Sequence, residues 1–246
     1  MKFLKVCLLT ATASSAFADT TLTYSTTDGD VTMRMQFANG MMRADSFGRE
    51  ADSYMVYNSN NTTFTMIMKD NQQYFVSDKE QLESLGDMSV MMDKMLEKQM
   101  AQIPESQRAM MRGMMEQALK AQMPKKKPKA EYSLTGESDS VNGFDCEVVV
   151  KKGAGGKSDF CVADYSEVGM SSSEYAVISS FQKTIEAMAE QFGEDNSMDF
   201  SGLGDFIPVR YNQSSESGVL SDVNHDSISP ENFSIPQGYK KVEMPF

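Results

Sequence analysis

The chain has 246 residues, with 35 acidic and 23 basic side chains, a formal net charge of −12, no tryptophan and 22 methionines. This acidity opposes binding to nucleic acid and to anionic lipid surfaces, because like charges repel. The length suits one domain, or one domain with an insertion.

Residues 1–18 have the three parts of a secretory signal peptide: two early lysines, an apolar stretch, and the small-x-small cleavage site Ala16-Phe17-Ala18. The apolar stretch is shorter than the about 20 residues needed to cross a bilayer. No later segment is apolar enough to serve as a transmembrane anchor. We therefore expect cleavage after Ala18 and a single periplasmic domain over residues 19–246.

Residues 20–76 predict a β-meander, because short runs of alternating apolar and polar side chains are separated by turn residues. Asn39-Gly40 is a strong hairpin signal, since both residues tolerate a positive φ. Four methionines of these runs are expected on one face of the sheet: Met33, Met35, Met66 and Met68.

The apolar period becomes helical at Ser77-Asp78-Lys79-Glu80, a predicted capping box in which Glu80 reaches back to the Ser77 amide. Helical spacing continues to about residue 123, and Pro104 breaks it. Proline suits the first turn of a new helix, where its missing N–H costs nothing. The sequence therefore predicts a methionine-rich helical hairpin, residues 87–102 against 104–122, inside an insertion at about 79–123.

Strands are predicted again after the insertion, and one further helix begins at Ser172 and ends at Gly193. The remaining predicted strands cover residues 131–135, 144–151, 157–164, 208–212, 218–223 and 233–242. The pattern indicates the α+β class, with a curved antiparallel sheet and helices packed on one face.

Cys146 and Cys161 flank the glycine-rich turn Gly153-Ala154-Gly155-Gly156. A hairpin closed there would place the two cysteines directly opposite each other, at a Cα separation of about 4.5–5.5 Å that a disulfide can bridge. Export would supply the oxidising compartment. We therefore predict a Cys146–Cys161 disulfide rather than a redox or metal pair.

The methionines allow three interpretations. They can be core filler, because methionine is flexible and forms helices well. They can line a pliable apolar groove, for which the candidates are Met33, Met35, Met66, Met68, Met111 and Met115. They can also bind Cu(I) or Ag(I), which select thioethers, and the candidates for that site are Met88, Met91, Met92 and Met95.

No nucleophile, zinc, phosphate-loop or dinucleotide motif occurs in the sequence. The single histidine, His225, follows an asparagine and precedes an aspartate, which is typical of a polar surface turn. We therefore expect no catalytic residue, no cofactor and no enzymatic activity.

Three features together resemble a family of bacterial periplasmic proteins known as a domain of unknown function. They are the segment 99–111 (QMAQIPESQRAMM), the segment 142–146 (NGFDC) and the closing segment 233–239 (FSIPQGY). The order of elements is more distantly similar to the lipoprotein carriers LolA and LolB. That similarity implies a half-open barrel that closes over an apolar cavity with helices.

The sequence therefore predicts a periplasmic, non-enzymatic binding protein with a methionine-lined groove for a lipid, a lipoprotein or an apolar peptide. The alternatives are a Cu(I)- or Ag(I)-binding protein, and a structural or envelope-stress protein without a small ligand.

Overall fold

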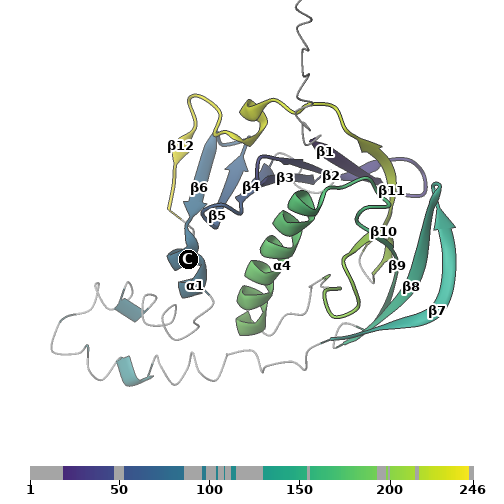
Figure 1. Cartoon of the computed structure of the whole chain (residues 1–246). Helices are drawn as coiled ribbons and strands as arrows, with labels where there is room; N and C mark the ends of the chain where they lie inside the picture. The colour runs from purple at the N-terminus through teal and green to yellow at the C-terminus, as the bar shows by residue number, and fades with distance from the viewer. Residues whose placement is uncertain are drawn as a thin grey trace, which may run out of the picture.

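The computed structural model describes residues 19–46, 53–85, 130–153, 156–192, 200–213 and 216–243, with isolated positions at 96–97, 104, 108, 112–114 and 198. One twelve-stranded sheet dominates these residues, in the order β12-β6-β5-β4-β3-β2-β1-β11-β10-β9-β8-β7. Figure 1 shows this sheet curling around the long helix α4 (Ser172–Phe192). The strands of the first half are β1 (Thr20–Ser25), β2 (Val31–Ala38), β3 (Met41–Ser46), β4 (Ser53–Asn58), β5 (Thr63–Met68) and β6 (Gln73–Ser77). Those of the second half are β7 (Glu131–Val141), β8 (Phe144–Gly153), β9 (Gly156–Asp164), β10 (Phe206–Asn212), β11 (Ser217–Asn224) and β12 (Lys240–Lys241).

The predicted α+β class is wrong. The fold is a single curved, mixed sheet, and in the described part of the chain the only α-helices longer than one turn are α1 (Lys79–Leu85) and α4. Alternating sequence continues through both halves, so strands rather than helices build the fold. The sheet is mixed because β12 pairs in parallel with β6, whereas every other ladder is antiparallel.

The closing segment also departs from the predicted strand over residues 233–242. It forms a short 3₁₀-helix, η1 (Pro230–Phe233), a turn, and the two-residue strand β12. Pro236 has no N–H to donate to a ladder, and Gly238 adopts a positive φ of 89° that ends the extended run.

Both helices begin with capping boxes. At α1 the box is one residue later than predicted: Asp78 Oδ1 accepts the Gln81 amide at 2.9 Å, and Gln81 Oε1 accepts the Asp78 amide at 3.2 Å. At α4, Ser171 and Glu174 form the equivalent pair. The predicted helical hairpin after α1 lies almost entirely outside the described residues. Within the described residues, no helix is both long and apolar enough to cross a membrane.

The two faces of the sheet carry separate cores. The inner face, toward α4, includes the buried residues Leu22, Tyr24, Phe37 and Tyr57. The outer face of β2–β6 buries a smaller cluster that includes Tyr54, Val56 and Ile67 beneath Phe233. The C-terminal segment is attached there by Arg43, which stacks on Tyr54, pairs with Asp45 at 2.7 Å and donates to the Asn232 carbonyl at 3.0 Å.

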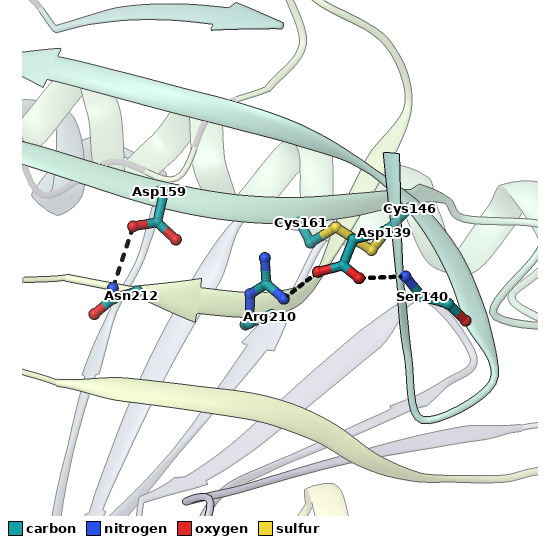
Figure 2. Close-up of polar contacts among 7 residues, drawn as sticks. All are labelled: Asp139, Ser140, Cys146, Asp159, Cys161, Arg210 and Asn212. Carbon is teal, nitrogen blue, oxygen red and sulfur yellow. Dashed lines mark hydrogen bonds and ion pairs between the residues drawn. A yellow bond between two sulfur atoms is a disulfide. The ribbon is translucent and has the colours of Figure 1, made fainter. Parts of the chain in front are cut away.

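The Cys146–Cys161 disulfide is confirmed, with a Cα separation of 5.4 Å. The predicted register of the β8–β9 hairpin is wrong. Cys161 lies opposite Val148, because the β8–β9 turn closes at Gly153 and Gly156 rather than one residue earlier. The disulfide is therefore diagonal across the hairpin. Figure 2 shows it beside an ion pair between Asp139 and Arg210, whose charged atoms are 2.6 Å apart.

Candidate functional site

A cavity of about 200 Å³ lies between α4 and the inner face of the sheet. Its walls come from β1–β4, from α4, and from β10 with the loop before it. The lining residues are Tyr24, Met33, Met35, Met42, Ala44, Met55, Ile178, Phe181, Gln182, Ile185, Met198, Phe206, Ile207, Pro208 and Tyr211. None of these side chains is charged, so the cavity favours an uncharged, apolar occupant.

Cross-strand register explains why methionines gather on this wall. Directly opposed residues in antiparallel strands share a face and have Cβ atoms about 4.5–5.5 Å apart. One row of such residues crosses the sheet from β1 to β6: Leu22, Met35, Ala44, Met55, Met66 and Phe75. Ala44 has the smallest side chain in that row, and it lies between Met35 and Met55 at the cavity wall.

The methionines predicted for the apolar groove have different positions. Met33 and Met35 line the cavity. Met66 and Met68 lie on the same inner face, half-buried, beyond the cavity lining. The two predicted helical members, Met111 and Met115, lie outside the described residues, as do all four residues of the alternative metal site (Met88, Met91, Met92 and Met95).

Three methionines that line the cavity were not among the groove residues predicted from the sequence: Met42, Met55 and Met198. Met55 was not predicted because the sequence pattern was assigned to its apolar neighbours Tyr54 and Val56. The structure places those two residues in the outer cluster. Met42 opposes Phe37 and Tyr57 and is 2% exposed. Pairing every strand of the meander from the Asn39-Gly40 hairpin onward would have placed Met42 and Met55 on the inner face, whereas no sequence signal identified Met198.

Polar contacts hold α4 over the sheet beside the cavity. The Tyr57 hydroxyl lies 2.8 Å from Ser180 Oγ and 3.3 Å from Thr184 Oγ1, one helical turn apart. The Tyr57 ring also meets Phe181 edge-on, with ring centroids 5.4 Å apart. These contacts join α4 to β4 next to Phe181, which lines the cavity.

Met198, which belongs to the described part of the chain between α4 and β10, also lines the cavity. Gln182 Nε2 donates to the Met198 carbonyl at 2.9 Å, which ties this segment to the helix. Phe200 is 1% exposed, and its ring meets Tyr132 and Phe160 edge-on at 5.4 and 5.3 Å. The aromatic cluster thus holds the segment at Phe200 and leaves Met198 at the cavity.

Three side chains of the lining carry a polar group: Tyr24, Gln182 and Tyr211. The Tyr24 hydroxyl donates to the Pro208 carbonyl at 2.9 Å, and burial, with Tyr211 nearby, raises the pKa of Tyr24 well above its ordinary value. Tyr24 therefore stays protonated and neutral. Gln182 uses its amide N–H on Met198, which leaves its carbonyl oxygen as an acceptor at an otherwise apolar wall.

The described residues contain no group of three or more His, Cys, Asp or Glu side chains placed to hold a metal ion. His225 lies near Thr20, with Nδ1 and Oγ1 3.4 Å apart, away from the cavity lining.

A comparison with protein families matches residues 55–239 to the model described as "Domain of unknown function (DUF4412)". A comparison with curated proteins finds no match. Two solved structures, "Structure of PNGF-II in C2 space group" and "Structure of PNGF-II in P21 space group", match at 8% identity with TM-scores of 0.41 and 0.40. Each match covers 92% of this chain but only 31% of the other, so this chain spans less than a third of those proteins. A likeness at these TM-scores supports no conclusion about activity.

Proposed function

We propose that this chain, which belongs to the DUF4412 family, is an exported, non-enzymatic protein. It binds a small apolar ligand, or the end of an acyl chain, in the methionine-lined cavity. The observation that carries the proposal is an uncharged cavity of about 200 Å³ with five methionines in its walls. Methionine surfaces re-pack around varied ligands, because the side chain is unbranched and polarizable.

The size of the cavity limits the ligand. A dry cavity of about 150 Å³ lined by apolar side chains holds a benzene molecule. A space of about 200 Å³ therefore suits a small aromatic molecule or the last carbons of an acyl chain, whereas a whole lipid would extend beyond it. Met66 and Met68, half-buried on the same inner face, would extend the apolar surface for such a ligand.

Export supplies the setting for this proposal. Cleavage after Ala18 would deliver the mature chain to the periplasm, where lipids and lipoproteins cross between membranes. The LolA- and LolB-like arrangement is part of the same proposal, in which a curved sheet and α4 enclose a site for an acyl group.

Dye binding and native mass spectrometry test the function. Protein purified from the periplasm should bind N-phenyl-1-naphthylamine at one site, lose it to a medium-chain fatty acid, and carry a lipid-sized adduct in native spectra. An Ala44→Leu variant, which narrows the cavity, should bind the dye at least about tenfold more weakly, the factor that 1.4 kcal/mol corresponds to. Absence of both the adduct and dye binding would contradict the proposal.

A second candidate has one observation in its favour. Thioethers are soft ligands that select Cu(I) and Ag(I), and Met33, Met35, Met42, Met55 and Met198 all line one cavity. Titration with Cu(I) against a competing chelator tests it, and a Met33→Leu, Met35→Leu variant is the matched control. A binding site no tighter than micromolar would end this alternative.

A further inference from the structure

A second cavity, of about 250 Å³, lies at the N-terminal end of α4. The β2–β3 hairpin supplies one side of it through Asn39 and Gly40, and α4 supplies another through Ser173 and Glu174. Asp19, the residue that immediately precedes β1, completes this part of the lining.

Glu174, one of the residues that line this cavity, has a buried carboxyl oxygen without a hydrogen-bond partner among the described residues. Its side chain is 8% exposed. Oε2 accepts the Ser171 amide and the Ser171 hydroxyl, both at 2.8 Å. Oε1 is buried and has no hydrogen-bond partner among the described residues. Leaving a buried acceptor without a partner is costly, and more so when the group is charged.

The charges around the cavity are unbalanced. Its described lining includes the carboxyl groups of Asp19 and Glu174 and no basic side chain. Asp19 Oδ2 accepts the Ile228 amide at 2.7 Å, and Thr20 pairs with Phe37 in the sheet. These contacts hold the start of β1 at the cavity wall.

The predicted cleavage site lies beside this second cavity, because Asp19 is part of the cavity lining. Signal peptidase would hydrolyse the amide bond between Ala18 and Asp19. One water is consumed, Ala18 keeps the carboxylate, and the released proton passes to the new amine. An α-amino group has a pKa of about 7.7–8.0, so most of it is an ammonium ion at neutral pH.

We propose that this second cavity binds the chain's own α-ammonium group on Asp19, with Glu174 Oε1 as its hydrogen-bond acceptor. The inference rests on the proposed cleavage after Ala18. The pair forms only in the processed chain, because in the precursor the same nitrogen is a neutral amide. It ties β1 to α4, the two elements that lie on opposite sides of the apolar cavity, so the mature chain is more stable than its precursor.

The test combines a displaced N-terminus with an isosteric change at Glu174. One exported chain keeps the native junction, and a second carries Gly-Ser between Ala18 and Asp19. Each is made with Glu174 and as Glu174→Gln, which removes the charge but retains an acceptor for the Ser171 cap. Glu216→Gln, at an exposed position, is the matched control. Intact mass identifies the first residue, and urea unfolding without ligand gives the unfolding constant.

The insertion should raise the unfolding constant about tenfold when Glu174 is present, the scale of a lost, partly buried ion pair. It should have little effect in Glu174→Gln, and its full effect in the Glu216→Gln control. Equal effects in all backgrounds would overturn the proposal. So would rescue of the inserted chain by calcium, which would make the cavity a cation site instead.

A failure of the proposed cleavage gives a different result. If intact mass shows another first residue, the proposed export step is wrong, independently of the apolar cavity. The same unfolding comparison is then made on chain released at Asp19 by a site-specific protease. An insertion effect that depends on Glu174 supports the ammonium site, and its absence overturns it.

Discussion

Filling the apolar cavity at Ala44 should stabilise the protein and abolish ligand binding together. Ala44 lies between Met35 and Met55 at the cavity wall. Ala44→Leu adds three carbons to this space. At about 0.8 kcal/mol per buried CH₂, complete burial would contribute roughly 2.4 kcal/mol. The upper limit is the cost of the whole void, about 5 kcal/mol for 200 Å³ at about 24 cal/mol per Å³.

We expect a net gain of about 1–2 kcal/mol in the free energy of unfolding, because the leucine must adopt one rotamer among flexible methionines. For a chain of this size this corresponds to a rise in Tm of roughly 2–8 °C. Thermal unfolding followed by circular dichroism, with urea unfolding in parallel, measures it. Dye titration on the same samples measures binding.

Ala163→Leu is the matched control. Ala163, in β9, is 2% exposed in the core cluster that includes Leu22 and Tyr24, and it lines neither of the two cavities. The same three carbons should overpack that site and lower the free energy of unfolding by about 1–3 kcal/mol. If Ala44→Leu is destabilising by a similar amount, the space beside Met55 is filled in solution and the reasoning is refuted.

Three further predictions concern the contacts that support the site. Cys146→Ser with Cys161→Ser should lower the free energy of unfolding in urea by about 3 kcal/mol, since the disulfide closes a loop of 15 residues; no change would mean that the bridge does not form. Tyr57→Phe should cost about 1 kcal/mol, because the Ser180 and Thr184 hydroxyls lose their contacts with the Tyr57 hydroxyl, and it should widen the cavity enough to alter dye affinity. The hydrogen bond from Arg210 lowers the pKa of Asp139. That pair therefore contributes stability above the ordinary carboxyl pKa and loses it as pH falls through the lower folded-state value. Asp139→Asn should flatten the acid limb of a stability-against-pH curve.

Local pattern predicted most of the strands and little of their assembly. Alternation identified the meander from β1 to β6, and the flanking glycines identified the β8–β9 hairpin. When a glycine-rich turn closes one residue later than predicted, each residue of the hairpin pairs with a partner two positions away from the predicted one. Cys161 therefore opposes Val148 rather than Cys146. The disulfide still forms because a diagonal pair lies within reach at 5.4 Å.

Long-range contacts determine the site, and those were the least predictable. The helix predicted from Ser172 is α4, but its position over the methionines depends on Tyr57 meeting Ser180, 123 residues away. The parallel pairing of β12 with β6 likewise joins the end of the chain to the end of the meander. Neither contact has a local sequence signal. Because these contacts and the succession of strands produce one mixed sheet, the fold differs from the predicted α+β class.

Crystals of the mature protein soaked in a bromoalkane would test the binding proposal most directly, because bromine can be located by its anomalous scattering. We expect a bromine peak between α4 and the inner face of β2–β4, in contact with Met35 and Met55, and no such peak in the Ala44→Leu variant. An empty cavity in crystals that bind the compound elsewhere, or an unchanged peak in the variant, would contradict it.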